Sequence, residues 1–263
     1  MVPRVFLVLW SALLYAFLLA PIAVIVIFAF SDAASFAFPP GSYSLRWFRY
    51  LAGRDEFLTA VAVSFEIAML AAAGAVLIGL PAAIGLVRKR LPAHRAIEAL
   101  LMGPLVLPGI VVGIALLQYF TALGITSSFG RLVLGHLLLC LPYAIRSISA
   151  SLYGLDSSLE EAARTLGATR WRAFSRVLLP LLRPGIAAGF LFAFITSFDN
   201  VVVSIFLIGA DTVTLPIRIL NWIEWQFDPS IAAISAIMLA LTTGLVLLAE
   251  RLTAGGIGTG LPH

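Results

Sequence analysis

The sequence predicts an all-α, polytopic membrane protein that crosses the bilayer six times, keeps both termini in the cytoplasm and projects a helical hairpin there. Of its 263 residues, 61% are hydrophobic and 11% are charged, whereas ordinary soluble domains contain about 25% charged residues. The mean hydropathy is +1.06. A soluble fold of this size cannot bury so much apolar surface, so these values exclude a soluble enzyme, a disordered chain and a small secreted scaffold.

Six apolar runs are each long enough to cross a membrane, because ~20 apolar residues span the hydrocarbon core as a helix. The runs cover residues 5–30, 57–87, 99–122, 131–146 (with a continuation to 152), 184–209 and 229–249. The first is too long for the apolar region of a signal peptide, so we expect it to remain as a span. The third contains Pro104 and Pro108, so we expect its first half to be bent or broken. Residues 1–263 are expected to form a single transmembrane domain.

Basic residues in the connecting loops set the predicted orientation. With the N-terminus in the cytoplasm, twelve of the 17 basic residues fall on the cytoplasmic side and five on the outer side. The positive-inside rule therefore favours six spans with both termini inside. Gly53 is then expected outside, and Arg90 and Gly256 inside. Aromatic residues around Trp47 indicate a short helix at the outer interface.

Cysteine and histidine form no catalytic or metal-binding pattern. The single cysteine, Cys140, excludes an intrachain disulfide and a cysteine-based metal cluster. The three histidines lie far apart and form no HxxxH spacing. His136 and Cys140 are four residues apart on one face of the fourth run, and we expect them to pack there, with a ligand role as the alternative. We therefore predict no catalytic residue, no metal site and no cofactor in this chain.

The segment 153–183, between the fourth and fifth runs, is the longest polar stretch between spans and predicts two short helices. Ser157 or its neighbour Ser158 can cap the first helix, whose first turn is acidic, as the helix dipole favours. Gly167 suits the left-handed residue that ends this helix. Thr169 can cap the second helix.

The second helix is expected to cover residues 170–179 and to stop at Pro180. Four residues of this water-facing hairpin are apolar: Leu166, Trp171, Phe174 and Val177. A merely solvated hairpin is the alternative, but these side chains predict burial against the protein's own helices or against a partner.

The hairpin also carries a spaced motif: Glu-Ala-Ala, three residues, Gly, nine residues, Val, one residue, Leu-Pro. Its positions are Glu161, Ala162, Ala163, Gly167, Val177, Leu179 and Pro180. The motif resembles that of the inner-membrane subunits of binding-protein-dependent ATP-binding cassette (ABC) importers, with valine in place of isoleucine. The resemblance implies that these residues, together with Arg170, couple the permease to an ATPase.

The likeness extends over nearly the whole chain. The stretch FDNVVVSIFL at 198–207, the stretch SLRWFRYL at 44–51 and the stretch LPGIVVGIAL at 107–116 are similar to the C-type permeases of the spermidine/putrescine group. That group carries an acidic pair before VVVS, whereas here the second acid is replaced by Asn200. The resemblance implies a small, amine-bearing solute, although related permeases carry opines, phosphonates or 4-aminobutyrate.

The energy source is expected to lie outside this chain. A P-loop needs GxxxxGK[ST], and the only lysine, Lys89, follows an arginine. The resemblance implies two cytoplasmic ATP-binding subunits that hold the ATP, a second permease that completes a heterodimer, and a periplasmic solute-binding protein. It also implies a bacterial inner-membrane location in the lipid bilayer. The net charge of +4 sits in loops between spans, so it indicates orientation and not nucleic-acid binding.

Two other classes remain as alternatives. An ion-driven secondary transporter would show several intramembrane acids or repeated broken helices, but only Glu66 and Asp199 lie within the runs and no repeat is evident. An intramembrane enzyme would need paired catalytic groups, and His136 is the only histidine in a run.

The two acids within the runs are the candidate solute pathway. A charged group at membrane depth costs at least ~2.5 kcal/mol and usually faces a cavity or a partner. Glu66 and Asp199 both fall in the predicted outer half of their spans, where they could bind a cation. Ser197 and Asn200 flank Asp199 and complete the candidate set. The alternative is that the acids are neutralised structurally, by hydrogen bonds, protonation or an arginine such as Arg218.

Overall fold

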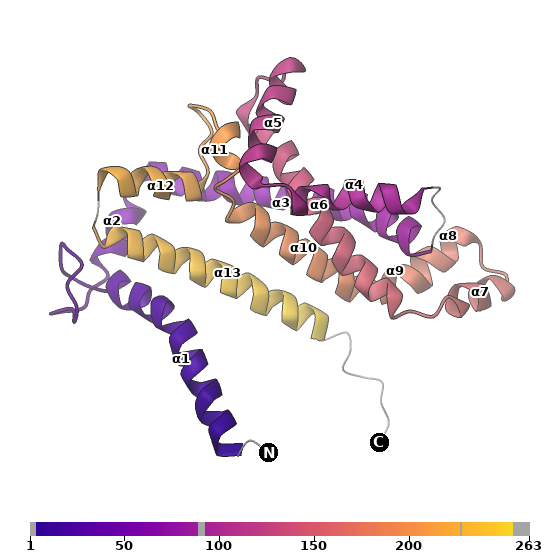
Figure 1. The fold of residues 1–263 in the computed structure, drawn as a ribbon, viewed down its shortest axis with the longest axis horizontal. Helices are drawn as coiled ribbons and strands as arrows, with labels where there is room; N and C mark the ends of the chain where they lie inside the picture. Colours follow the sequence, from indigo (N-terminus) through magenta and orange to yellow (C-terminus); the bar gives the residue numbers. More distant parts are fainter. Residues whose placement is uncertain (1–3, 89–92, 227, 255–263) are drawn as a thin grey trace. The chain divides into compact units, whose positions relative to one another are not determined.

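The computed structural model describes residues 4–88, 93–226 and 228–254, and in these ranges the chain is almost entirely helical (Figure 1). The elements are α1 (Arg4–Ala29), α2 (Arg46–Ala52), α3 (Asp55–Val87), α4 (His94–Val106), α5 (Gly109–Ala122), α6 (Ser128–Tyr153), α7 (Ser158–Thr165), α8 (Arg170–Ala173), the π-helical turn η1 (Phe174–Leu178), α9 (Leu179–Leu181), α10 (Arg183–Phe198), α11 (Ser204–Leu207), α12 (Leu215–Trp225) and α13 (Ser230–Ala254). Two isolated β-bridges are the only strand pairing in the described ranges. The all-α prediction is confirmed.

Four helices, α1, α3, α6 and α13, are long and apolar enough to cross a membrane individually. Two bent pairs raise the number to as many as six if each pair is one span: α4 with α5, bent by 108°, and residues 170–181 with α10, bent by 64°. The bend between α4 and α5 falls at Pro108, which precedes the first residue of α5. The predicted break of the third span is therefore confirmed. The short helix expected around Trp47 is present as α2, and its place at the outer interface stays a prediction.

The fifth span differs from the prediction. Its helix α10 ends at Phe198 and does not continue to residue 209. The reason is local: the side-chain oxygen of Asn200 accepts hydrogen bonds from the backbone N–H groups of Val203 and Ser204, at 3.0 and 3.3 Å. An asparagine that binds the backbone in this way favours the start of a new helix over the continuation of an old one. The span therefore breaks, and the short helix α11 follows.

The chain divides into two compact units, one with Met1–Thr59 and Arg218–Thr243 and the other with Ala60–Ile217 and Gly244–His263. In the first unit, Arg218 lies 3.7 Å from a carboxylate oxygen of Glu56, and Arg54 lies 3.8 Å from the other. The guanidinium of Arg54 also covers the rings of Tyr50 and Trp222, at 4.8 and 5.5 Å from their centroids. Arg218 thus has its own acidic partner within this unit.

In the second unit, α6 packs against α10 through small residues. A Cβ built on Gly189 of α10 would lie 3.2 Å from the Cα and the carbonyl oxygen of Ala144 in α6. A Cβ on Gly79 of α3 would lie 3.2 Å from the Cβ of the same alanine. Small residues let helix backbones approach closely, which is how membrane helices gain most of their packing energy. Ala144 is fully buried where these helices meet.

Candidate coupling hairpin and solute pathway

The turn of the hairpin is a glycine-terminated helix end. Gly167 has a φ of +89°, a left-handed conformation that costs a side-chain-bearing residue ~1–2 kcal/mol. Its N–H donates to the carbonyl of Arg164, and the N–H of Ala168 donates to that of Ala163, both at 3.0 Å. These two bonds make the Schellman arrangement, which pairs carbonyls that the end of α7 would leave free. The predicted glycine turn is confirmed.

The start of each hairpin helix has a capping residue, but one of them differs from the prediction. Thr169 caps α8, as expected, by accepting from the N–H of Arg172 at 3.2 Å. Ser157 occupies the cap position of α7 without a side-chain bond, and Asp156 accepts from the N–H of Ser158 at 2.9 Å instead. This hydrogen bond, with a smaller contribution from Arg88, holds the pKa of Asp156 below its ordinary value of 3.8. The carboxylate is the stronger acceptor, so it displaces the serine hydroxyl from this role.

The second hairpin helix extends further than predicted. It does not stop at Pro180 but continues through η1 and α9 to Leu181, where the chain enters α10. Pro180 lies in the first turn of α9, where a missing N–H is tolerated. In the wider π-helical turn before it, the N–H of Leu179 donates to the carbonyl of Phe174. The Leu-Pro end of the motif therefore joins the hairpin directly to a span.

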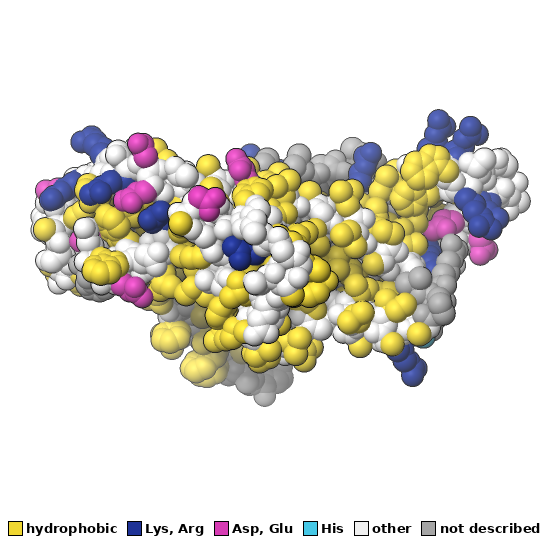
Figure 2. Space-filling model, turned by 90° about the horizontal axis from the view of Figure 1, so that it is seen from above, with side chains coloured by type: hydrophobic (Ala, Val, Ile, Leu, Met, Phe, Trp, Pro, Cys, Tyr) yellow, Lys and Arg dark blue, Asp and Glu magenta, His cyan; other side chains and the backbone are white. Residues whose placement is uncertain are grey.

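The outer face of the hairpin is open. Leu166 is 89% exposed and Trp171 is 73% exposed, whereas Phe174 and Val177 are partly buried. Glu161 and Ala162 are exposed, and the Glu161 side chain makes no ion pair in the described part of the chain. A surface hollow of about 560 Å³ is lined by Glu161, Arg164, Thr165, Gly167, Ala168 and Thr169. Figure 2 shows basic and acidic side chains gathered over the hairpin at the right of the view.

The base of the hairpin is anchored in the second unit. Leu152, Leu178 and Leu182 are buried together, against the apolar side chains of Ile84 and Val87 at the end of α3. Arg88, directly after α3, lies 3.2 Å from a carboxylate oxygen of Glu160 in α7. The motif residues thus form one continuous element from the exposed tip at Gly167 to the root in the span helices.

A polar cluster lies where the fifth span breaks. Within it, buried His136 of α6 contacts the hydroxyl of Ser197 through Nδ1, at 2.7 Å, and that of Ser204 through Nε2, at 2.9 Å. The hydroxyl of Ser204 donates its proton to the carbonyl of Asn200, at 2.6 Å. It must therefore accept from His136, which places a proton on Nε2. His136 and Cys140, which donates to the carbonyl of Ala193 at 3.0 Å, are packing residues as expected.

The four predicted pathway residues do not form one cluster. Ser197 is buried on His136, and the carbonyl-type oxygen of Asn200 is occupied by the backbone, so both hold the break in place. Asp199 is the C-cap residue of α10 and is exposed, and Glu66 is exposed on α3. Neither acid makes an ion pair with a described residue. Glu66 follows Phe65, whose ring lies 5.6 Å from that of Phe194 in α10.

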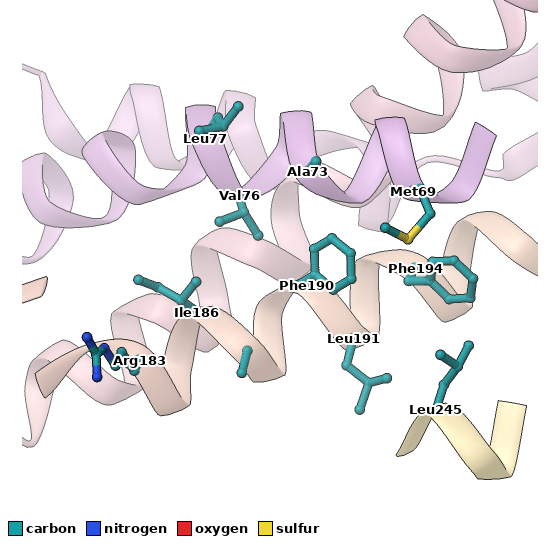
Figure 3. A pocket seen from close by; sticks show the side chains of 11 residues that line it. Met69, Ala73, Val76, Leu77, Arg183, Ile186, Phe190, Leu191, Phe194 and Leu245 are labelled. Carbon is teal, nitrogen blue, oxygen red and sulfur yellow. The ribbon is translucent and has the colours of Figure 1, made fainter. Parts of the chain in front are cut away.

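An apolar groove of about 560 Å³ runs between α3 and α10 (Figure 3). Met69, Val76 and Leu77 approach from α3, and Ile186, Phe190 and Leu191 from α10, with Leu245 of α13 at one side and Arg183 at one end. Apart from Arg183, its walls offer no charged group to a polar solute. We therefore place the candidate solute contacts at the break after α10 and not in this groove.

Comparison with known proteins decides the family. Residues 75–254 match the model of the binding-protein-dependent transport system inner membrane component. The chain belongs to this family. It is a multi-pass permease subunit of an ABC importer of the bacterial inner membrane, which excludes the ion-driven alternative. The match covers the hairpin, the broken fifth span and α13.

Relatives of this permease extend along nearly its whole length. It is 34% identical to the spermidine/putrescine transport system permease protein PotC of Haemophilus influenzae, over 91% of this chain and 93% of that protein. It is 32% identical to PotC of Escherichia coli, over 93% and 94%. It is also 34% identical to the putrescine transport system permease protein PotI of Escherichia coli, over 86% and 82%.

Solved structures support the fold of the permease. One is a bacterial ABC transporter involved in the import of the acidic polysaccharide alginate, with a TM-score of 0.71, 16% identity and coverage of 94% of this chain and 96% of that one. Another is the alginate transporter in complex with an alginate pentasaccharide-bound periplasmic protein, with a TM-score of 0.69, 16% identity and coverage of 98% and 96%.

Sequence reasoning missed three contributors to these sites. Arg88 lies in a basic run that was used only to assign orientation, and its partner Glu160 was considered only for the helix dipole. Ser204 gave no signal of its own, because a serine in an apolar run has many possible partners. The usable signal was His136: a histidine in a span must hydrogen-bond to something, since an unpaired polar group in hydrocarbon costs several kcal/mol.

Proposed function

We propose that this permease imports a small, amine-bearing cation of the polyamine class, with Asp199 as the residue that the cation meets in the membrane. The observation that carries the proposal is an exposed carboxylate, without an ion-pair partner among the described residues, at the broken end of a span helix. The names of the relatives, spermidine/putrescine and putrescine permeases, indicate the same chemistry.

The position of Asp199 favours a positive charge in two ways. The carboxylate itself is negative, and it sits at the C-terminal end of α10, where the helix dipole adds about half an elementary negative charge. Broken helices whose ends point at the solute are a recurring design in transporters, because free backbone groups are tolerated only beside a cavity or a pathway. Asn200, held by the backbone of α11, and Ser197, held by His136, keep this end in place.

Glu66 has a supporting role in this proposal. Phe65, the neighbour of Glu66, contacts Phe194, and Asp199 lies five residues, or about 7.5 Å, further along α10. A polyamine carries positive charges spaced along a flexible chain, and two acids at nearby levels suit such a solute. Contact with either acid must be weak, because a solute that binds tightly in mid-membrane would leave slowly.

The partners follow from the proposal. The hairpin would dock through Glu161, Ala162 and Ala163 on one of two cytoplasmic ATP-binding subunits, which bind and hydrolyse the ATP. A second permease would complete a heterodimer, and a periplasmic solute-binding protein would deliver the solute. The structure described as holding a pentasaccharide-bound periplasmic protein supports the last of these by its fold. The open tip of the hairpin, with Leu166 and Trp171 uncovered, supports the first.

The test uses the complete complex with its partner subunits and cognate binding protein in proteoliposomes. The ligand retained by the purified binding protein is identified first, and ATP-dependent uptake of labelled spermidine is then compared with that of zwitterionic 4-aminobutyrate. Asp199→Asn should lower spermidine uptake about tenfold, the factor that corresponds to ~1.4 kcal/mol from a lost charge-assisted contact. Glu66→Gln should have a similar but smaller effect.

Asp211→Asn is the matched control, because Asp211 is an exposed acid in the next loop and also makes no ion pair in the described ranges. It should transport at the parental rate. Parental uptake by both Asp199→Asn and Glu66→Gln would remove the acids from the pathway. A binding protein that retains an uncharged or anionic ligand would overturn the polyamine assignment itself.

A further inference from the structure

The two neighbouring glutamates at the start of α7 have different surroundings. Glu160 is inward: its Oε1 lies 3.2 Å from a terminal nitrogen of Arg88, and the two side chains are only 23% and 15% exposed. Glu161 is exposed and makes no ion pair with a described residue. The motif glutamate therefore faces outward, to a partner, and the glutamate before it faces the protein's own span.

Arg88 is well placed to hold the hairpin. It directly follows α3, and its N–H continues the helix by donating to the carbonyl of Ile84 at 3.1 Å. Its charge acts on Glu160 and also, at longer range, on Asp156, which caps α7. Its Nε is buried and has no hydrogen-bond partner in the described part of the chain. In the described part of the chain, the guanidinium thus makes its ion pair and its hydrogen bond with Glu160, at the start of the hairpin.

The surroundings make this ion pair stronger than a surface pair. Exposed pairs contribute ~0–1 kcal/mol because water screens them. Here the side chains of Arg88 and Glu160 are only 15% and 23% exposed, beside the apolar cluster at the hairpin root, to which Val87 and Leu155 belong. Removing one partner would leave the other partly buried without a counter-charge, which costs more than the pair itself contributes.

The span that ends just before Arg88 reaches the candidate pathway. The single helix α3 runs 33 residues and carries Glu66. Two residues before this acid, the buried hydroxyl of Ser64 accepts from the N–H of Leu215, at 2.7 Å, at the start of α12. A displacement of the hairpin applied at Arg88 therefore acts on a helix that is hydrogen-bonded, near its other end, to the segment after the broken fifth span.

We propose that the Arg88–Glu160 ion pair is a positioning link that transmits movement of the coupling hairpin to α3. It rests on the proposed role of the hairpin in coupling and extends it: Glu161 and the alanines meet the ATPase, and Glu160 passes the displacement to the span through Arg88. The apolar root holds the base of the hairpin in place, and the ion pair connects α7 to the end of α3. Loss of the ion pair lets the hairpin move without α3.

Charge exchange tests the link in the reconstituted complex. ATP hydrolysis and solute uptake are measured on the same proteoliposomes, and their ratio is the readout. Arg88→Glu and Glu160→Arg should each raise the ATP consumed per solute imported about fivefold, the factor that ~1 kcal/mol of lost interaction gives. The double exchange should return the ratio to within about twofold of the parent, which a merely structural role for either residue would not do.

Three further variants make the result decisive. Glu160→Gln keeps the shape of the side chain, so it should raise the ratio even if a reversed charge prevents assembly. Arg95→Glu reverses an exposed arginine of α4 that forms no ion pair in the described ranges, and should leave the ratio unchanged. Glu161→Lys tests the hairpin role itself and should stop uptake.

The outcomes separate the two proposals. A parental ratio in Arg88→Glu and Glu160→Gln, with uptake stopped in Glu161→Lys, overturns the link and leaves the hairpin role intact. Parental uptake in Glu161→Lys overturns the hairpin role. If the double exchange consumes as much ATP per solute imported as the single variants do, the two residues act separately. This result also overturns the link.

Discussion

His136 shows how one residue can fix the geometry of a broken span from a neighbouring helix. It is 1% exposed and joins α6 to both sides of the break in the fifth span, through Ser197 before it and Ser204 after it. Without it the buried hydroxyl of Ser197 would lose its partner, whereas that of Ser204 would keep its bond to the carbonyl of Asn200. The histidine therefore stabilises a backbone interruption that hydrocarbon surroundings would normally forbid.

Replacing His136 by leucine should destabilise the assembled complex by about 1–2 kcal/mol. The hydroxyl of Ser197 loses its partner, and interhelical hydrogen bonds in membranes are worth somewhat less than those in soluble cores. Titration of the purified complex with SDS measures the free energy of unfolding. His94→Leu, which changes a partly exposed histidine at the start of α4, is the control and should differ little from the parent. Equal stability of His136→Leu and the parent would contradict this account of the break.

Asp156 is a second single residue with a structural role, because its carboxylate caps the start of α7. Asp156→Ala removes the acceptor for the N–H of Ser158, so backbone amides 158–161 should exchange hydrogen faster in the assembled complex. Ser157→Ala is the matched control, because Ser157 makes no capping bond. Hydrogen–deuterium exchange with mass spectrometry compares the two. Faster exchange in Ser157→Ala than in Asp156→Ala would return the cap to the serine.

The pH dependence of this cap has a defined sign. The pKa of Asp156 is below its ordinary value of 3.8 in the folded protein, so the carboxylate form is the one that folding favours. Its stabilising contribution is complete above pH 3.8 and is lost as the pH falls through the lowered pKa. Between pH 5 and 8, exchange of the α7 amides corrected for intrinsic rates should therefore be constant at this helix end.

At the scale of elements, the sequence predicted what depends on local chemistry. Gly167 indicated the turn because only a residue without Cβ adopts φ +89° cheaply, and Pro108 indicated the bend between α4 and α5. The end of α10 was missed because apolar composition continues to residue 207, and hydropathy does not record a backbone that turns. Asn200 held the signal, but an asparagine in an apolar run fits a cap and a pathway residue equally well.

The contact between α6 and α10 predicts the sign of the change in unfolding free energy when a glycine is replaced by alanine. Gly→Ala in a helix normally stabilises, by ~0.5–1 kcal/mol, since alanine loses less backbone entropy on folding. A Cβ at Gly189 would lie 3.2 Å from two backbone atoms of Ala144, so Gly189→Ala should instead destabilise by about 1–2 kcal/mol. Gly244→Ala in α13 meets no atom within 4 Å and should be neutral or stabilising. The SDS titration distinguishes them, and a stabilised Gly189→Ala would show that the helices are not in close contact.

The hairpin turn gives a second prediction for an element. Gly167→Val should leave the permease inserted but stop ATP-driven uptake, because valine at φ +89° strains the turn and disturbs the Schellman bonds. Space is not the obstacle, since a Cβ there meets no atom within 4 Å. Gly154→Val is the control in the same segment: Gly154 has φ −78°, and its Cβ would make only an ordinary contact at 3.6 Å. Uptake is measured against the amount of complex purified, and normal uptake by Gly167→Val would remove the turn from coupling.

At the scale of the whole molecule, two apolar surfaces of the permease are exposed, one on α1 and one on the hairpin. Helix α1 buries only Ala29 of its 26 residues, and apolar side chains cover its remaining faces. In water such a surface would aggregate, but in a bilayer it is what lipid and partner helices contact. The hairpin likewise exposes two large apolar side chains, Leu166 and Trp171. These two surfaces could be predicted as apolar from the sequence, but what covers them could not, since an apolar pattern does not identify the surface that it contacts.

Orientation is the remaining property of the whole molecule, and α3 makes it testable with two residues. A helix of 33 residues is about 50 Å long, so we expect the loops at its ends to lie on opposite sides of the membrane. The arginine distribution predicts that the Arg88 side, and with it the hairpin, faces the cytoplasm. The earlier markers Arg90 and Gly256 lie outside the described residues, so Leu166, at the exposed tip of the hairpin, replaces them.

Single cysteines at position 53 or 166 in a Cys140→Ala background should therefore respond oppositely to a membrane-impermeant thiol reagent. In intact spheroplasts, Gly53→Cys should be labelled and Leu166→Cys should be protected, whereas permeabilised cells should label both. Cys140 is fully buried and bonded to the carbonyl of Ala193, so the Cys140→Ala background without a new cysteine is the control for its removal. Labelling of position 166 with protection of position 53 in intact spheroplasts would invert the permease, put the hairpin on the side without ATP, and exclude the coupling proposed for it.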